Sequence, residues 1–371
     1  MMDLANWRSW KSGWLVFLMV LFGVQEVSVA DTKKPSRRPI QNPPAETNTY
    51  HYRMAGRVRL LLFWVGKDDV GGGSITFSDR FLPSAQLKAE GIEVLFGSNP
   101  KQVPGGINRW GYGQEWAYWK VPNDASEGEL QYTVFTGFMR HSDEEALSQV
   151  FTSRQHEQSS QLYWYDGIES VVRPGETVSH VRHFAEPQEF DYQQSELVQS
   201  AYRQRLGAGP PDKTKVLNNG SRLYSTPYGF LTCLREVSRQ ISNRFQSRGE
   251  EFLKGHYSAT YAYNANTYVL EVTRLKYHSS FSLTDREPEG KGRSTTQQFS
   301  DVAEVDLRLR NQTDGSKHDF SLWFPLRGIQ QGVPLRILDK PRWWLQVDLR
   351  LASQSDDTSP MSGLSDFGLT E

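Results

Sequence analysis

The stretch YSATYAYNANTYVLEVTRLKYHSSFSL, residues 257–283, decides the fold class of this 371-residue chain. Apolar and polar residues alternate along two runs that meet around Asn264, Ala265 and Asn266. Asparagine accepts the backbone angles of a tight turn, and a period of two places successive side chains on opposite faces of a strand. The stretch therefore predicts two antiparallel strands joined by a turn.

The pentapeptide Val-Asp-Leu-Arg-Leu continues this pattern, because it occurs at 305–309 and again at 347–351. In both copies the apolar residues share one strand parity and the charged residues share the other. We therefore expect a C-terminal antiparallel sheet with one dry and one solvated face. If the copies were neighbouring strands, the aspartates of each would meet the arginines of the other. Chance similarity between two amphipathic strands is the simpler explanation of the match.

Three segments have helical rather than strand patterns. In GFLTCLREVSRQISNRF (229–245) apolar residues recur every three or four positions, so one helix face would collect them. A helix is predicted at 142–154 because Ser142-Asp-Glu-Glu145 forms a capping box. Another is predicted at 195–206, where Gly207 and the breaker AGPPD close it.

The N-terminal half consists mainly of strand-like runs, rich in β-branched and aromatic residues and bounded by turn formers. The predicted strands are 56–65, 73–77, 91–96, 115–121, 131–139, 162–168 and 177–184. The sequence thus predicts an α+β fold that is mostly β, with curved antiparallel sheets packed with a few amphipathic helices. The breaker at 208–212 divides it into an N-terminal β-rich domain with helices (50–207) and a C-terminal domain of helix plus sheet (221–352).

The first thirty residues have the features of a secretory signal peptide. Arg8 and Lys11 precede the apolar run 13–24, and Ser28-Val29-Ala30 provides a cleavage site after Ala30. Twelve apolar residues are too few to span a hydrocarbon core of about 30 Å as a helix. Residues 31–49 then form a disordered linker, and 353–371 a disordered tail. We expect an exported protein, periplasmic or extracellular, without a transmembrane segment in the mature chain.

Composition narrows the choice of partners. Lys plus Arg (42) and Asp plus Glu (43) nearly cancel, so no nucleic-acid partner is expected.

Cys233 is the single cysteine, which excludes an intramolecular disulfide, and its apolar surroundings predict a buried structural thiol. No motif for a nucleotide, a metal or another cofactor is found, so none is predicted. His180 and His183 lie three apart in a predicted strand and would point to opposite sides.

The segment FWVGKDDVGGGSITF (63–77) raises three possibilities. A phosphate loop is excluded because its lysine precedes the glycines and a strand pattern follows them. A cation site would use Asp68 and Asp69 as oxygen ligands, with Asp79 nearby, but EF-hand spacing is absent. The simplest interpretation is that Gly71 to Gly73 form a loop or bulge between strands.

Carboxylates and aromatic residues supply the remaining site candidates. Asp68, Asp69 and Glu115 are weak candidates for the two catalytic carboxyls of a glycosidase. Candidate ligand-binding residues, for which packing in the core is the simpler explanation, are Trp110, Tyr112 and Trp116 in PGGINRWGYGQEWAYW and the consecutive Trp343 and Trp344. On a strand, only one of two consecutive tryptophans can face the core.

These observations favour a non-enzymatic exported protein that binds an apolar or amphipathic small molecule, or an envelope protein, between sheet and helix. The alternative is an extracytoplasmic hydrolase or carbohydrate-acting enzyme that uses the Asp and Glu carboxylates. A scaffold protein without a small ligand is the third hypothesis.

Overall fold

The computed structural model describes residues 46–60, 63–82, 86–98, 102, 110–120, 129–141, 162–173, 176–187, 213–218, 228–263, 266–286, 294–342 and 345–352. The predicted signal peptide, the helices at 142–154 and 195–206, the tail at 353–371 and residues Trp343 and Trp344 lie outside the described residues. Of the predicted linker 31–49, only its last four residues are described, and they belong to the first strand.

Fourteen antiparallel strands form one sheet in the part of the chain that the structure describes. The first eight are β1 (Glu46–Leu60), β2 (Phe63–Leu82), β3 (Leu87–Ser98), β4 (Trp110–Lys120), β5 (Glu129–His141), β6 (Leu162–Arg173), β7 (Glu176–Pro187) and β8 (Lys213–Asn218). The last six are β9 (Ser258–Tyr263), β10 (Asn266–Arg286), β11 (Ser294–Asn311), β12 (Lys317–Pro325), β13 (Arg336–Arg342) and β14 (Leu345–Leu351).

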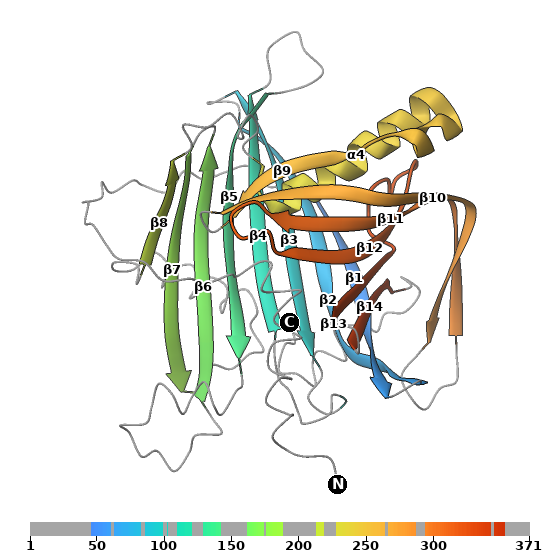
Figure 1. The fold of residues 1–371 in the computed structure, drawn as a ribbon, viewed down its shortest axis with the longest axis horizontal. Helices are drawn as coiled ribbons and strands as arrows, with labels where there is room; N and C mark the ends of the chain where they lie inside the picture. The colour runs from blue at the N-terminus through green and yellow to red at the C-terminus, as the bar shows by residue number, and fades with distance from the viewer. Residues whose placement is uncertain are drawn as a thin grey trace.

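The two halves of the sheet meet where the first strand pairs with the last. The spatial order runs from β8 down to β1, then from β14 down to β9, so β1 and β14 are neighbours. Figure 1 shows β1–β8 side by side, with β10–β12 running across them. The sheet is therefore continuous across the breaker at 208–212 that separates the two predicted domains.

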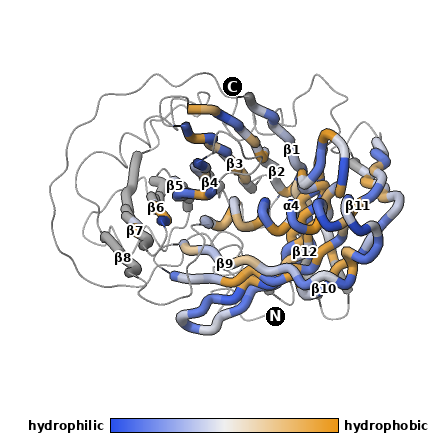
Figure 2. Tube along the Cα trace, turned by 90° about the horizontal axis from the view of Figure 1, so that it is seen from above, coloured by the Kyte–Doolittle hydropathy of each residue, from blue (hydrophilic) through white to orange (hydrophobic). Residues whose placement is uncertain are grey.

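A single α-helix among the described residues, α4 (Phe230–Arg248), lies inside the curve of this sheet (Figure 2). A short 3₁₀ helix, η4 (Gly249–Lys254), follows it. The predicted helix at 229–245 is confirmed, and its apolar stripe is buried as expected, since Leu231, Val237, Ile241 and Phe245 belong to the core. Of the several helices that the sequence predicts, the described residues confirm this one.

The predicted mostly β, antiparallel character is also confirmed. Tyr263 pairs with Asn266, so the turn falls at the predicted asparagines. The predicted runs at 91–96, 131–139, 162–168 and 177–184 lie within β3, β5, β6 and β7.

Two predictions in the segment 56–77 are wrong. The run 56–65 is not one strand, because Leu60 pairs with Phe63 and the chain reverses between them without any typical turn residue. Gly71 to Gly73 do not form a loop, because they lie inside β2 and pair with β1 and β3. The irregularity is instead a bulge just before them, where Asp69 has a φ of 65° and three β2 residues lie opposite Ala55.

The prediction of a solvated face in the C-terminal sheet is confirmed for β10–β12, where Arg274 is 53% and Asp319 61% exposed, but two carboxylates on that face are buried. The two Val-Asp-Leu-Arg-Leu strands are β11 and β14, and β12 and β13 lie between them, so the proposed cross-pairs do not form. Asp348 is 0% exposed, and Glu304 only 9%. Cationic side chains bind both carboxylates: Lys276 and His278 of β10 contact Glu304, whereas Arg336 of β13 and Arg350 of the same strand bind Asp348.

Candidate functional site

The inner face of β1–β5, which contacts α4, carries a hydrophobic surface that is only partly covered. Tyr52, Ile75 and Ile92 are buried there. Around them, other large side chains pack against the core and stay partly accessible, namely Tyr50, Phe77, Val94 and Phe96. Tyr50 meets the edge of Phe77 at a centroid distance of 6.0 Å, and Tyr52 meets Phe96 at 5.9 Å. These residues form the inner hydrophobic surface.

Charged groups border this surface on the side of α4. The Arg235 guanidinium lies over the Phe77 ring at 5.6 Å, and its Nη1 is 3.5 Å from Glu90 Oε2. Among the described residues, that buried Nη1 atom has no hydrogen-bond partner. Lys88 donates to Glu90 at 2.7 Å, and Phe81, which pairs with Lys88, is 54% exposed. The border therefore combines cations with exposed aromatic surface.

Glu115 anchors the N-terminus of α4 from the same inner face. Gly229 precedes the helix and has no side chain to cap it. Instead, the Glu115 carboxylate of β4 accepts from the backbone N–H of Thr232 at 2.7 Å and of Leu231 at 3.2 Å. These are two of the four amides that a helix start leaves unpaired, and the helix dipole favours a negative charge there. Glu115 is 1% exposed.

The surroundings of Glu115 favour a structural role over catalysis. Burial raises the pKa of the Glu115 carboxyl, and the hydrogen bonds from Thr232 and Leu231 offset this only in part. A side chain at Gly229 would collide with the carboxylate, so the helix start fits closely around it. Burial also raises the pKa of the neighbouring Cys233 thiol, which makes it a poor nucleophile and agrees with the predicted buried cysteine.

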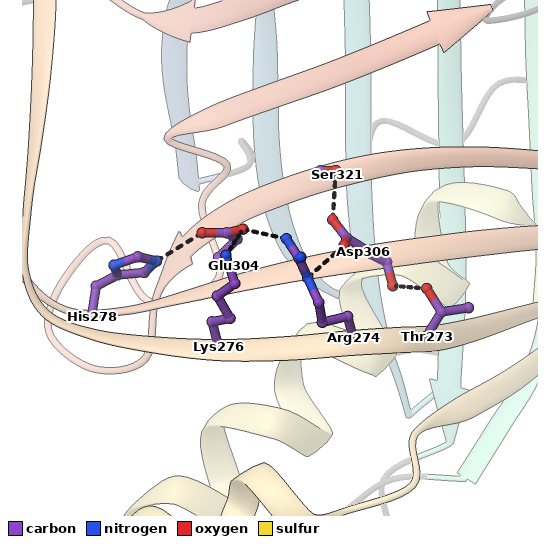
Figure 3. Close-up of polar contacts among 7 residues, drawn as sticks. All are labelled: Thr273, Arg274, Lys276, His278, Glu304, Asp306 and Ser321. Atoms are coloured by element: carbon purple, nitrogen blue, oxygen red, sulfur yellow. Dashed lines mark hydrogen bonds and ion pairs between the residues drawn. The ribbon is translucent and has the colours of Figure 1, made fainter.

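A second polar cluster lies on the outer face of β10–β12 (Figure 3). Glu304 accepts from Arg274 and Lys276, both at 3.0 Å, and lies 2.9 Å from His278 Nε2. Arg274 also forms an ion pair with Asp306 at 2.8 Å. Asp306 is further bound by the hydroxyl groups of Ser321 and Thr273. This network fixes three neighbouring strands to one another on the side away from α4.

The pKa of Glu304 is shifted in the opposite direction to that of Glu115. Burial acts to raise it, but the donors Lys276 and His278 outweigh burial and hold it below the ordinary value of 4.5. Glu304 is therefore a carboxylate stabilised in its charged form, whereas Glu115 is disfavoured in that form.

The structure separates the three carboxylates considered for catalysis. Phe77 pairs with Ile92 and Ile92 with Glu115, whereas Asp69 lies eight residues before Phe77 in β2. At about 3.3 Å per residue this separates Asp69 from Glu115 by about 20 Å or more. A two-carboxylate glycosidase needs about 5–10 Å. Asp68 adjoins Asp69 in the bulge, so it does not approach Glu115 either.

Trp116, one of the aromatic candidates of β4, lies on the other side of the strand from Glu115. Trp116 follows Glu115 directly and therefore faces outward, where Arg80 stacks on its ring at 4.4 Å and Gly91 lies beneath it. Trp110 and Tyr112 occupy positions of the same parity in β4. Trp116 is thus not brought together with the inner hydrophobic surface, and the binding role of all three residues stays a prediction.

The residues of the inner surface were not selected from the sequence, although one signal was present. Tyr50, Phe77 and Phe96 are aromatic residues in strand-like runs, but periodicity alone does not tell a covered position from a partly covered one. Arg235 had no signal at all, because its importance depends on the approach of α4 to Phe77 and Glu90.

Two further features concern metals and membranes. Within the described residues, no group of three or more His, Cys, Asp or Glu side chains is placed to hold a metal ion. None of the helices in those residues combines the length and hydrophobicity needed to cross a membrane.

Comparison with known proteins adds little to this description. No protein-family model and no curated protein matches the chain. A solved structure, a beta-barrel-like protein of a domain of unknown function from Brucella abortus, aligns with a TM-score of 0.36 and 9% identity. The alignment covers 82% of this chain and 96% of that chain. At this level the similarity supports no conclusion about function.

Replacing Glu115 tests its role at the helix start. We expect Glu115→Ala to lower the free energy of unfolding by about 1–3 kcal/mol, because two buried amides lose their acceptor. Glu115→Gln removes the ionisable carboxyl but keeps the length of the side chain, so it tests the effect of the charge alone. Since the pKa of Glu115 is raised in the folded state, the wild type should gain stability relative to Glu115→Gln as pH falls from 7 toward 4.5. Urea unfolding at several pH values measures this, and a pH-independent difference would contradict it.

Glu304 should show the opposite pH dependence. Because its pKa is lowered in the folded state, Glu304 stabilises the fold above pH 4.5, and this contribution is lost as pH falls below 4.5. We expect Glu304→Gln to destabilise the protein by about 1 kcal/mol at pH 7 and by less at pH 4. Asp319→Asn, which breaks an exposed ion pair with Arg308, is the control and should have a smaller effect. A larger effect of Glu304→Gln at pH 4 than at pH 7 would refute this role.

Proposed function

We propose that this protein binds an apolar or amphipathic molecule between the inner hydrophobic surface and α4, without catalysing a reaction. The observation that carries the proposal is that Tyr50, Phe77, Val94 and Phe96 face the helix side of the sheet and yet remain partly exposed. Ligand sites are typically concave and lined mainly by hydrophobic and aromatic side chains. A sheet that curves around one helix provides such a surface.

The charged border gives the expected ligand a polar end. Arg235 lies directly over Phe77, so a molecule packed on the aromatic rings would bring a polar group close to the guanidinium. The buried Nη1 atom can donate a hydrogen bond to such a group, because its contact with Glu90 at 3.5 Å is an ion pair without a hydrogen bond. This arrangement favours an amphipathic ligand over a purely apolar one.

The N-terminal sequence is the basis for a proposal about the cellular compartment in which the protein acts. We propose that residues 1–30 direct export and that the mature chain begins at Asp31, in the periplasm or outside the cell. An envelope protein is then an alternative occupant of the same surface. N-terminal sequencing of the processed protein that finds another first residue, or an unprocessed chain, would contradict the export proposal.

Titration with a fluorescent apolar probe such as N-phenyl-1-naphthylamine tests the ligand site. We expect Phe77→Ala and Phe96→Ala to weaken probe binding by about fivefold or more, since each removes aromatic surface from the site. Val65→Ala is the matched control, because Val65 is also exposed and hydrophobic but lies at the opposite end of β2. It should bind the probe like the wild type.

Mass spectrometry of the purified mature protein then identifies any lipid that stays bound. The proposal fails if no molecule co-purifies and the probe does not bind. It also fails if all three variants bind the probe like the wild type. A stable envelope protein found in place of a small molecule would favour the alternative occupant.

A further inference from the structure

Two cations share one carboxylate at the border of the inner hydrophobic surface. Glu90 accepts a hydrogen bond from Lys88 Nζ at 2.7 Å through Oε1, and its Oε2 lies 3.5 Å from Arg235 Nη1. Within the part of the chain that the structure describes, these are the only ion pairs of Lys88 and Arg235, which we call the cation pair. Burial acts to raise the pKa of Glu90, but the cation pair outweighs burial and holds that pKa below the ordinary value of 4.5. Glu90 is thus a charged carboxylate shared by two cations.

The other acids nearby do not bind the cation pair. Asp79 lies opposite Glu90 in the neighbouring strand, but it is exposed and forms no ion pair with either cation. Glu236, which follows Arg235 in α4, is bound by Arg239 at 2.8 Å and by Gln240 at 2.9 Å. Glu90 is therefore the one carboxylate of the described residues that the cation pair contacts.

The cation pair is accessible to a ligand. The exposed fraction of the side chain is 45% for Lys88 and 35% for Arg235, against 20% for Glu90. Phe81, which pairs with Lys88 and so shares its face, is 54% exposed. The guanidinium makes no hydrogen bond within the described residues, because its contact with Glu90 is an ion pair only. An oxyanion can therefore bind Arg235 without displacing a hydrogen bond of the protein.

The aromatic residues beside Arg235 set the direction of a bound chain. The guanidinium carbon lies 5.6 Å from the centroid of the Phe77 ring, and this stacking leaves N–H groups at the guanidinium edge for an acceptor. Phe77 pairs with Ile92, and Phe96 lies four residues further along β3, which is about 13 Å. Both phenylalanines are partly accessible. A molecule held at Arg235 thus has hydrophobic surface beside it for an extended chain.

We propose that the ligand of the inner hydrophobic surface is an anionic amphiphile, whose carboxylate or phosphate group binds Arg235 and Lys88 and whose apolar chain packs on Phe77 and Phe96. This inference rests on the proposed function and adds the charge and the orientation of the ligand. A cationic head group is repelled by the same two side chains, and a neutral one gains no ion pair. A free fatty acid and an anionic phospholipid both present the required oxyanion.

Displacement of N-phenyl-1-naphthylamine by amphiphiles of equal chain length tests the charge of the ligand. Decanoate is anionic, decyl maltoside neutral and decyltrimethylammonium cationic, and each is used below the concentration at which it forms micelles. We expect decanoate to displace the probe from the wild type at a concentration about tenfold lower than either of the others, because it alone forms a charge-assisted hydrogen bond with arginine.

Replacing Arg235 tests the anchor itself. We expect Arg235→Gln to weaken decanoate binding by about tenfold and to leave decyl maltoside binding unchanged. Arg248→Gln is the matched control, because Arg248 is an exposed arginine in the last turn of the same helix. It should keep the preference for decanoate. Arg235→Lys, which keeps the charge but not the planar fork, should retain part of the preference and serves if Arg235→Gln does not fold.

The anion inference and the proposed function fail in different ways. If the probe does not bind the wild type and no molecule co-purifies, the proposed function fails and the inference fails with it. If the probe binds but the three amphiphiles displace it equally, the inference alone is overturned. The same holds if Arg235→Gln and Arg248→Gln behave alike.

A lysophosphatidylglycerol with the same acyl chain separates the two sources of the oxyanion. If it displaces the probe at a lower concentration than decanoate, the inference holds with a phospholipid as the ligand. If decanoate is the stronger of the two, the inference holds with a fatty acid. If neither displaces the probe at a lower concentration than decyl maltoside, the inference is overturned.

Discussion

The pairing of β1 with β14 is the constraint on which the rest of this structure depends. It joins the first described strand to the last, and with it two runs of consecutive antiparallel strands become a single curved sheet. The curve gives the molecule two different surfaces. The inner one surrounds α4 and is largely hydrophobic, and the outer one carries the charged network of β10–β12 (Figures 2 and 3). The proposed ligand site follows from this division.

The N-terminus of a helix placed inside a curved sheet has unpaired backbone amides. The surrounding sheet has to supply hydrogen-bond acceptors for them. The first amides of α4 are buried, so water cannot serve them, and Gly229 offers no side chain. Glu115 meets the requirement from β4 although burial disfavours its charge. On the outer face the pKa shift has the opposite direction, because Glu304 is surrounded by cationic side chains that favour its charged form. The position of each carboxylate relative to its donors, and not its burial alone, decides its behaviour.

The sequence allowed the features that depend on local pattern to be predicted. Alternation and asparagines located the β9–β10 turn, and the spacing of Leu231, Val237 and Ile241 located α4. The reversal between Leu60 and Phe63 was missed because no glycine, proline or asparagine marks it. The role of Glu115 could not be predicted, because it depends on helix amides more than a hundred residues away in the chain. Sequence periodicity carries no information about such distant contacts.

The place of β14 in the sheet has a consequence for the order in which the protein can be built. Residues 345–351 are synthesised after every other described strand, yet they occupy a position in the interior of the sheet, with β1 on one side and β13 on the other. A growing chain that still lacks them has two separate groups of strands, each with an open edge at the missing position. The two groups of strands therefore cannot join into one curved sheet during translation until residues 345–351 have left the ribosome, and both edges stay open until then.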